Sequence, residues 1–535
     1  MLNPSPILDV SGRPMPRASA ASGATSAYQA AERYASELAG WMPTLASADA
    51  DLLPERDTIV ARFRDLARND GWVKGLLKRE RDAVVGGGLI LQSRPDYRAL
   101  GLSHAQATEV ATQIEAAWRQ WADDPLMRSD VARRRTFGGL QRLAYGHWQT
   151  DGEALAVLHW RPDAGGPWAT TLRIVDPDRL SNPHEACDTD RIRAGVEQSE
   201  DSAPIAYHIR VRHRMDLWGT SRADAYRWER LERETAWGRP IVIHHFEGDR
   251  AEQSRGVPSA AVIKAVKMLS HGADLELQAF IINAVFAAFI ESPMDPTLLD
   301  QRLGLGDMTK GYQAQRAEYH ASANMRFNGV KIPKLFPGER FQLNAAQRPA
   351  AGFGPFMGHF LQHLAAGTGQ TYMQVSQDWS QANYSSARAA LLDVWKGLVV
   401  NRASFITGFV QPVYLAWLEE AIDAGAVTLP PNAPSLYDMP AAWVRARWIG
   451  PGRGYIDPVK ETLAAQMRME AGLSTLEAEA AEQGLDWQEV LEQRRRELDE
   501  TDRLNLPRPA WATADLVAAT ATSPTDGNQQ QEKSK

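Results

Sequence analysis

The strongest pattern of apolar positions in the chain lies between residues 383 and 425. Apolar side chains recur there at steps of three and four, which places them on one face of an α-helix: Leu391, Trp395, Leu398, Phe405, Phe409, Val413 and Ala416. Asn383 can cap the start of this helix, and Gly425 can end it in a left-handed conformation. The pattern predicts one very long helix, with two core helices that meet at a turn as the alternative.

Pro412 predicts an irregularity inside this long helix. Proline lacks an amide hydrogen, and its ring would clash with the carbonyl group of Gly408, four residues earlier. Because the residue at 408 is a glycine, a bend is easier there. We therefore expect a kink near residues 408–412.

A second long helix is predicted at residues 259–292, and its C-terminal half is apolar on nearly every side. Its apolar stripe comprises Val262, Val266, Leu269, Ala273, Leu277, Phe280, Ala284 and Ala288. A helix that is apolar nearly all round must be buried, either in a core or against copies of itself. Pro293 and Pro296 end the pattern.

The remaining pattern predicts a mixture of helices and strands, and hence an α+β protein. Further helices are expected at 57–85, with a break at Asn69-Asp70-Gly71, and at 104–122, 355–366, 458–471, 475–483 and 487–501. Strands are expected at 89–91, 154–160, 170–175, 205–212, 241–246, 330–335 and 340–343. The polar stretch 367–383 is expected to form an exposed loop between two helices, and 448–454 a glycine-rich turn.

Composition and charge exclude several classes of protein. The 535 residues carry a net charge of −7, whereas a protein that coats DNA would be strongly basic. Cys187 is the only cysteine, which excludes an internal disulfide framework and a cysteine-based zinc site. We expect no secretory signal, because the first twenty residues lack a basic start followed by an apolar core. We also expect no membrane span, because the apolar runs at 277–290 and 403–418 are too short.

The sequence lacks the motifs of common catalytic and phosphate-binding sites. It contains no His-Glu-x-x-His zinc motif, no Gly-x-Ser-x-Gly nucleophile motif and no Walker-type loop. His359 and His363 have the spacing of two metal ligands on a helix, but no acidic residue accompanies them there. His244 and His245 are adjacent in a predicted strand and should face opposite sides of it. We therefore predict no catalytic residue, no metal site and no cofactor.

Short stretches along nearly the whole chain resemble the portal proteins of tailed bacteriophages, and the lambda portal family in particular. They are Leu52-Leu53-Pro54, Arg68-Asn69-Asp70-Gly71, Arg134-Arg135-Thr136-Phe137, Gly152-Glu153, Ser181-Asn182-Pro183, Arg193-Ala194-Gly195-Val196, 253–256, 333–338, 384–389, 417–421, Trp448-Ile449-Gly450 and 470–475. None of these stretches is specific alone, and the resemblance depends on their shared order. Pro412 departs from the pattern, because its counterpart in the family need not be proline.

The resemblance implies a portal fold with an α/β wing, two stem helices, a small α/β clip, a long kinked helix and a helical crown. It divides the chain into a flexible N-terminal arm at 1–25, the wing at 26–255 and 385–455, stem helices at 256–292 and 353–370, the clip at 293–352, a tunnel loop at 371–384, the crown at 456–505 and a disordered tail at 506–535. Identical subunits would then assemble into a ring, expected to be a dodecamer.

In this family, the ring lies at one vertex of the capsid, and double-stranded DNA passes through its channel during packaging and ejection. The resemblance therefore implies a protein of the virion that is assembled in the cytoplasm of the bacterial host. The implied partners are further copies of the chain, double-stranded DNA, terminase, the major capsid protein, and head-completion or tail-connector proteins. An acidic protein suits a conduit, because it neutralises few phosphates and DNA can slide through it.

The residues that the resemblance places in the DNA channel are polar and mostly uncharged. They are Gln374, Ser376, Gln377, Asp378, Trp379, Ser380, Gln381 and Asn383. Asp378 carries the only charge of the set. Trp379 is either a packing anchor or a plug that faces DNA, and we favour the anchor.

Two other classes of protein are alternatives. The first is an enzyme of phage assembly, such as a nuclease or a protease, which the lack of any acid/base or metal constellation disfavours. The second is a scaffold of long helices unrelated to phages. That alternative leaves the small β-containing insert at 293–352 without an explanation.

Overall fold

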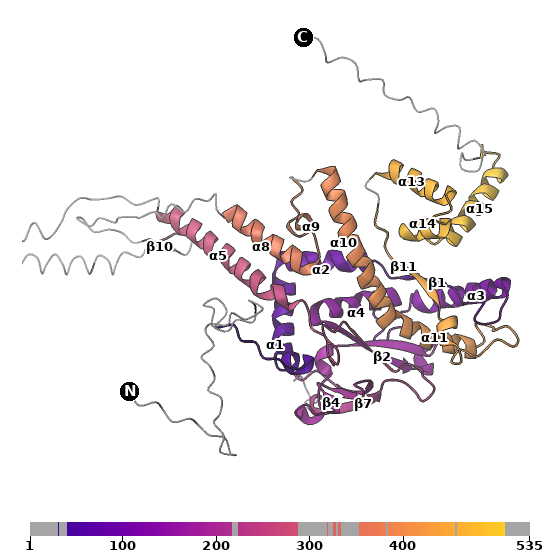
Figure 1. The fold of residues 1–535 in the computed structure, drawn as a ribbon, viewed down its shortest axis with the longest axis horizontal. Helices are drawn as coiled ribbons and strands as arrows, with labels where there is room; N and C mark the ends of the chain where they lie inside the picture. The colour runs from indigo at the N-terminus through magenta and orange to yellow at the C-terminus, as the bar shows by residue number, and fades with distance from the viewer. Residues whose placement is uncertain are drawn as a thin grey trace, which may run out of the picture.

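The computed structural model describes residues 40–216, 223–286, 353–380, 383–454 and 457–508, together with positions 30, 318, 325–327 and 330–332. In this part of the chain, a body of helices and antiparallel sheets carries two helices that project side by side (Figure 1). The architecture is α+β, as predicted. The expected arm at 1–25, most of the expected clip and residues 509–535 lie outside the described residues.

The larger part of the body is built on a three-stranded antiparallel sheet. Its strands lie in the order β3 (Thr170–Val175), β2 (Glu153–Trp160) and β8 (Val242–Phe246). The central strand β2 pairs Leu155 with Val175 on one side and with His244 on the other, and its first six residues are buried. The three strands predicted here are confirmed, and their composition, rich in β-branched residues and bounded by Pro, Gly and Asp, was the signal.

A second sheet has four antiparallel strands, of which the sequence predicted one. They lie in the order β4 (Ile192–Arg193), β5 (Val196–Gln198), β6 (Pro204–Arg210) and β7 (Trp228–Glu232). The strand expected at 205–212 is confirmed as β6. β7 has the sequence Trp-Glu-Arg-Leu-Glu, which lacks the alternation of apolar and polar residues that predicts a strand. None of its residues is buried. Pairing with β6 makes it a strand.

A short hairpin pairs β9 (Met325–Phe327) with β10 (Val330–Ile332). The strand expected at 330–335 is confirmed over its first three residues. Its expected partner at 340–343 lies outside the described residues, and β9, which was not predicted, takes that place.

Four helices complete this part of the body: α1 (Ala48–Asn69), α2 (Gly71–Val84), α3 (His104–Ala122) and α4 (Phe137–Asp151). Asp70 separates α1 from α2, as the turn signal predicted. Its side chain caps α2 by accepting a hydrogen bond from the amide of Val73 at 2.9 Å. Gly152 ends α4 with a φ of 81°, a conformation that favours glycine.

The expected turn at 448–454 is wrong for its first two residues. Strand β11 (Ala446–Ile449) pairs antiparallel with β1 (Ile90–Ser93), and a four-residue helix, α12 (Pro440–Trp443), precedes it. Trp448 lies against Trp118 and Tyr414 with ring centroids 5.7 Å apart in both pairs. Burial in this aromatic core therefore outweighs the local preference of the glycine-rich stretch.

The two projecting helices are α5 (Ile263–Phe286), preceded by a single 3-10 turn at Ala260–Val262, and α8 (Phe353–Thr368), and we call them the helix pair (Figure 1). Where the pair meets the body, one buried cluster combines apolar side chains from both helices, from the 3-10 turn, from α1 and α2, and from a short helix at Tyr372–Ser376: Phe63, Leu66, Val73, Leu76, Val262, Val266, Leu269, Leu361, Leu364, Ala365 and Val375. A Cβ atom at Gly367 would lie 2.5 Å from Val262, so the close crossing depends on that glycine.

The long helix predicted around residues 383–425 is confirmed. It comprises α10 (Tyr384–Phe405), a π-helical turn at Ile406–Val410, and α11 (Gln411–Asp423), with helical backbone angles at both junctions. Gly425 follows with a φ of 73°. The irregularity lies where Pro412 predicted it, because the wider π turn places the proline at the start of α11.

His245 explains why residue 408 is a glycine. A Cβ atom at position 408 would lie 2.0 Å from Nδ1 of His245, and this imidazole is itself packed against Trp148 and Phe405. The neighbouring His244 points to the other face of β8, where it contacts Glu153. The prediction that the two histidines face opposite sides is thus confirmed.

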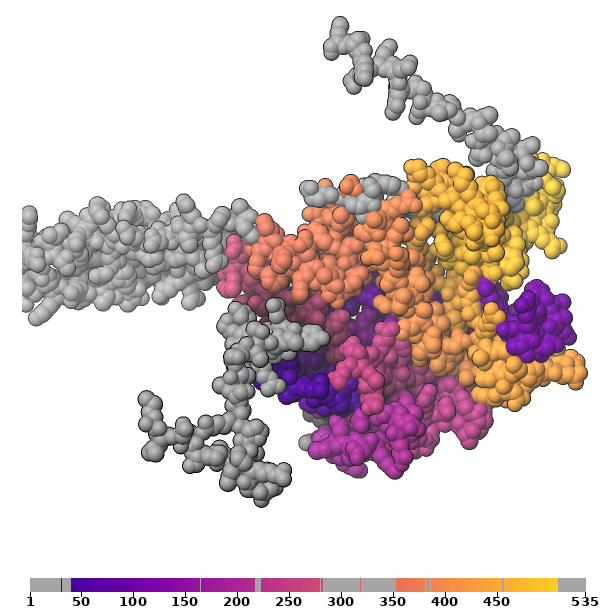
Figure 2. Space-filling model, in the orientation of Figure 1, coloured from indigo at the N-terminus to yellow at the C-terminus, as the bar shows by residue number. Residues whose placement is uncertain are grey.

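Three helices form a C-terminal unit beside α10: α13 (Pro458–Glu470), α14 (Leu476–Glu482) and α15 (Trp487–Arg503) (Figure 1). All three agree with the predicted helices to within two residues. Figure 2 shows this unit, in yellow, at the upper side of the body, next to the orange atoms of α10. We call residues 457–508 the C-terminal unit.

We expect Gly408→Ala to lower the free energy of unfolding by about 1–3 kcal/mol, because the buried His245 cannot move away from the new methyl group. Gly397→Ala is the matched control, since it lies in α10 with open space around its Cα. The control should stabilise the chain by up to about 1 kcal/mol through helix propensity alone. Denaturant unfolding measures both, and equal effects of the two substitutions would contradict the packing argument.

Candidate functional site

The segment expected to line the DNA channel begins with a helical turn and not with a loop. Helix α9 spans Tyr372–Ser376, and Thr371 caps it in a reciprocal capping box. The amide of Gln374 donates to Oγ1 of Thr371 at 3.2 Å, and the side-chain oxygen of Gln374 accepts from the amide of Thr371 at 3.1 Å. The expectation of an irregular, exposed loop from 367 to 383 is therefore wrong for residues 372–376. α8 also extends to Thr368.

The capping box removes Gln374 from the set of side chains free to face a channel. Ser376 is half-buried, and its hydroxyl accepts a hydrogen bond from the amide of Asp378 at 3.1 Å. Gln377 has a left-handed φ of 58° and ends α9. It also donates from its side chain to the carbonyl of Gln374 at 2.6 Å. Gln374 and Ser376, the first two residues predicted to line the channel, therefore form hydrogen bonds that stabilise the segment itself.

The exposed part of the segment is the stretch that follows α9. Gln377, Asp378, Trp379 and Ser380 are exposed, as is Asn383, while Gln381 lies outside the described residues. Hydrogen bonding from Ser380 lowers the pKa of the Asp378 carboxyl, so this group stays charged at neutral pH. Trp379 is 44% exposed, so one subunit covers about half of its side chain, and its role as a packing anchor stays a prediction.

Val375 ties this segment to the base of the helix pair. Its side chain is 1% exposed and belongs to the apolar cluster that contains Leu269 of α5 and Leu361 of α8. A buried aliphatic side chain contributes roughly 1.5–3 kcal/mol relative to an exposed one. The base of the segment is therefore held by the same core as the helix pair, while its polar end remains at the surface.

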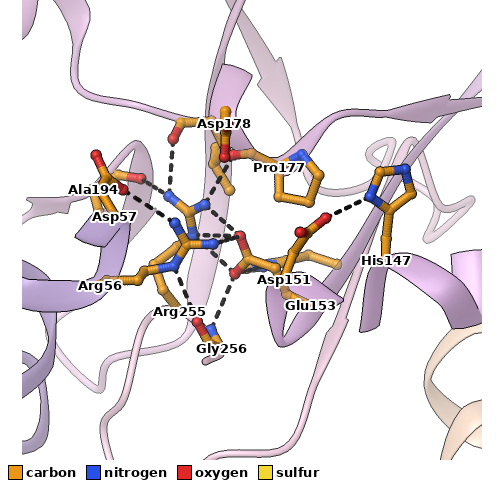
Figure 3. A network of polar contacts seen from close by, with 12 residues as sticks. Arg56, Asp57, His147, Asp151, Glu153, Pro177, Asp178, Ala194, Arg255 and Gly256 are labelled. Atoms are coloured by element: carbon orange, nitrogen blue, oxygen red, sulfur yellow. Dashed lines mark hydrogen bonds and ion pairs between the residues drawn. The ribbon is translucent and has the colours of Figure 1, made fainter. Parts of the chain in front are cut away.

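The connection that leads into α5 is held by a buried carboxylate, Glu153, at the start of β2 (Figure 3). Glu153 is fully buried. Arg255 contacts both of its oxygens, with Nε 2.9 Å from Oε2, and Arg56 of α1 donates from Nη2 to Oε1 at 2.7 Å. The amide of Gly256 and the imidazole of His244 complete the shell at 3.0 Å each. The charge of Glu153 is thus surrounded by partners from three segments: α1, β8 and the connection into α5.

The guanidinium group of Arg255 also donates hydrogen bonds to backbone carbonyl groups. Nη1 donates to the carbonyls of Leu180 and Ala194, both at 2.8 Å, and Nη2 donates to that of Pro177 at 3.0 Å (Figure 3). The side chain of Arg56 also donates from Nε to the carbonyl of Gly256 at 3.0 Å. Each buried donor therefore has a partner, as the burial of a charged pair requires.

The backbone passes too closely here for side chains at two of its residues. A Cβ atom at Gly256 would lie 2.1 Å from the carbonyl oxygen of Gly152, and one at Gly152 would lie 2.1 Å from Val257. The glycines let the connection cross the junction of α4 and β2 next to Glu153, which accepts a hydrogen bond from the amide of Gly256. The ion pairs and this crossing together set the direction in which the chain enters α5.

A second group of charges lies next to the first. Asp151, 1% exposed, accepts from Nε of Arg64 at 2.6 Å and contacts Nδ1 of His147 at 2.5 Å. Arg64 also pairs with Asp178 at 2.6 Å. Burial by itself would raise the pKa of Asp151, but hydrogen bonds from His147 and Arg64 outweigh it and lower the pKa.

The charge states of the first group follow from its contacts. Burial alone would raise the pKa of Glu153, but the charges of Arg255 and Arg56 outweigh it, and its pKa lies well below the usual value. Burial lowers the pKa of His244 despite its contact with Glu153. Burial, together with the neighbouring His244, also lowers the pKa of His245, to about 4. At neutral pH the carboxylate is therefore ionised and both histidines are uncharged.

Among the described residues around this site, the charged groups pair with one another and line no metal-binding cluster. A cavity of about 570 Å³ lies between the base of the helix pair and the body, lined by Phe63, Leu76, Tyr145, Trp148, Pro258 and Gly367 among others. Within the described residues, no group of three or more His, Cys, Asp or Glu side chains could hold a metal ion. His359 and His363 are both exposed on α8. None of the described helices is long and apolar enough to cross a membrane.

We call Glu153 and its partners Arg56, Arg255, Gly256 and His244 the anchor. The sequence did not reveal the anchor as a site, although Gly152-Glu153 and residues 253–256 were both among the stretches that resemble the family. Gly152-Glu153 and residues 253–256 are separated by about a hundred positions and carry no motif that links them. The available signal was an Arg-Gly pair directly before a long helix. Only the fold brings that pair to the acidic residue that follows α4.

Comparison with known proteins identifies relatives along nearly the whole chain. A family model described as "Phage portal protein, lambda family" matches residues 34–402. The portal protein of Escherichia phage N15 is 35% identical over 498 residues, 92% of this chain and 93% of that protein. Portal protein B of Escherichia phage lambda is 34% identical over 495 residues, 90% and 91% of the two chains.

Solved structures are more distant. A chain from the virion of a native gene transfer agent particle is 14% identical and covers 82% of this chain and 98% of that chain. Its TM-score of 0.41 is too low to support a conclusion about the fold.

We expect Glu153→Gln to lower the free energy of unfolding by about 3–5 kcal/mol, because it leaves Arg56 and Arg255 buried without a counter-charge. Asp57→Asn is the matched control, since Asp57 also pairs with Arg56 but its side chain is 83% exposed. The control should cost less than about 1 kcal/mol. Denaturant unfolding of both variants measures the difference, and similar costs would show that the anchor contributes little.

We also expect stability to fall as the pH is lowered from about 6.5 towards 4, because unfolded His245 binds a proton near pH 6.5. The buried imidazole binds one only near pH 4. The unfolded chain therefore holds more protons in this window, and the loss through His245 reaches about 3 kcal/mol at its lower end. Replacing the imidazole in His245→Leu should flatten this part of the curve of unfolding free energy against pH. An unchanged slope in that variant would refute the assignment.

Proposed function

The chain belongs to the lambda family of phage portal proteins, and on this premise we propose that it forms the ring-shaped channel through which double-stranded DNA is packaged and ejected. The relatives named above are portal proteins, so the alternative of a phage-assembly nuclease or protease has no support. The proposal assigns the ring to one vertex of the capsid, after assembly in the cytoplasm of the bacterial host.

The observation that carries the ring is an exposed apolar surface on α5. Met268, Leu275, Leu277 and Ile281 are between 42% and 58% exposed, although the helix is mainly apolar. A single subunit offers no cover for these side chains within the described residues. Contact between the helix pairs of neighbouring copies would bury them, as a closed ring of identical subunits requires.

The division into portal segments is part of the same proposal. The body corresponds to the wing, the helix pair to the two stem helices and the C-terminal unit to the crown. Residues 371–384 then form the tunnel segment. Its exposed part carries one acidic and no basic residue, so it can contact phosphates without the strong attachment that lysines would bring.

The partners follow from the family in the same way. We assign the region 293–352 to the clip, which would meet terminase during packaging and head-completion or tail-connector proteins afterwards. The wing would meet the major capsid protein, and a ring of twelve-fold symmetry is the expected assembly.

We expect Leu277→Glu with Ile281→Glu to abolish the ring while leaving the subunit folded, because both side chains are exposed within one chain. His271→Glu with Gln278→Glu places the same charges at exposed polar positions of α5 and should leave the ring intact. Native mass spectrometry or analytical ultracentrifugation measures the assembly. A wild-type chain that stays at 59.2 kDa at every concentration would refute the proposed ring.

We expect the combined variant Gln377→Ala, Ser380→Ala and Gln381→Ala to leave the ring intact but to impair DNA packaging or retention. Loss of the exposed Gln377 and Ser380 side chains should cost within roughly 0.5 kcal/mol each. Lysine at positions 377 and 381 should instead slow translocation by binding phosphates, and added salt should relieve the effect. Ring yield by size exclusion and packaged DNA per particle are the measurements. Normal packaging with unstable rings would place the segment at a subunit interface.

A further inference from the structure

The C-terminal unit has no apolar core of its own. Within residues 457–508, all of which the structure describes, the only buried residues are Glu461 and Asp486, and both are acidic. None of its side chains belongs to the three buried apolar clusters of the body. Helices α14 and α15 contain no buried residue at all. A unit of this composition normally needs a cover for its apolar side chains.

The apolar side chains of the unit are exposed in two sets. The first lies along α13, where Val459, Leu463 and Met467 are 78%, 45% and 59% exposed. Their spacing of four residues places them on one face of the helix. The second set lies on the other two helices and the turns around them, and comprises Leu473, Leu476, Leu485, Leu491, Leu504 and Leu506.

Polar contacts join the unit to its own body, and both sets remain exposed. Gln92 donates to Asp486 at 3.3 Å, Arg119 pairs with Glu489 at 2.7 Å, and Arg453 lies 3.4 Å from Glu461. These contacts fix the unit beside β1 and α3. They do not use the stripe on α13.

Charges beside the two sets are complementary. Glu470 is exposed three residues after Met467 and so shares the face of the α13 stripe. On α15, Arg494 and Arg495 are exposed three and four residues after Leu491 and share its face. One face therefore combines apolar side chains with a carboxylate, and the other combines a leucine with guanidinium groups.

We infer that the α13 face of one subunit packs against the α15 face of the next, so that the C-terminal units form a continuous collar. A closed ring of identical subunits needs two different surfaces that fit each other, and these two faces differ and match in charge. The unit would thus obtain its apolar core from its neighbours. This inference rests on the proposed ring, but it concerns a contact separate from that of α5.

Cysteine cross-linking of the assembled full-length chain tests the contact. The variant carries Met467→Cys and Leu491→Cys in a Cys187→Ser background, which removes the exposed native thiol. Rings are first verified by native mass spectrometry and then treated with a short bis-maleimide. We expect a ladder of covalent multimers on a denaturing gel. Each variant with only one of the two new cysteines should remain monomeric, because a head-to-tail contact brings unlike residues together.

The outcomes separate this inference from the proposed function. Intact rings that give no ladder overturn the collar and leave the ring standing. Covalent dimers of a single-cysteine variant, formed in the same yield as multimers of the double variant, also overturn it. They would show that the same residue of two subunits lies on both sides of the contact. A wild-type chain that forms no ring overturns both.

Charge reversal gives an independent readout by hydrogen exchange. Amides of α13 should exchange about tenfold more slowly in the ring than in dissociated subunits. Glu470→Arg should remove that protection, and adding Arg495→Glu should restore it. Glu500→Arg is the control, an equal charge change at an exposed position of α15 that lies nine residues from Leu491 and five from Arg495, and so away from their face. Equal protection in ring and subunit, or no restoration in the double variant, contradicts the contact.

Discussion

One buried negative charge, that of Glu153, sets the relation between the body and the helix pair. Its partners come from α1, β8 and the connection that leads into α5. Because a buried carboxylate without its cations is costly, these segments can meet in only one arrangement. An apolar contact of the same area would tolerate small rotations. The ion pairs and the hydrogen bonds to backbone carbonyls do not, since each depends on direction.

Apolar burial is distributed unevenly around this anchor. The body has a dense core in which Trp118 contacts Trp121, Phe137, Tyr414, Trp417 and Trp448. The far part of α5 and the C-terminal unit instead expose apolar side chains. Such a subunit is suited to assembly. Neighbouring subunits can cover the exposed apolar side chains of α5 and the C-terminal unit without changing the packed core of the body.

The proposed tunnel segment is coupled to the helix pair by packing. Val375 shares a cluster with Leu269 and Leu361, so a displacement of either helix near its base would move α9 as well. The exposed residues after α9 make mainly local hydrogen bonds, such as that from Ser380 to Asp378. The segment thus combines a fixed base with a tip that can adapt to a polymer of varying sequence.

The sequence alone determined the long helix, its irregularity before Pro412, the buried strands and the three C-terminal helices, because periodicity and caps are local signals. Resemblance supplied the family and the choice of residues 371–384. The tertiary structure decided the rest. It paired β11 with β1, made α9 a capped helix, and brought Arg255 to Glu153, 102 positions away. Such pairings depend on the distance between residues in space, which no local pattern of apolar and polar positions records.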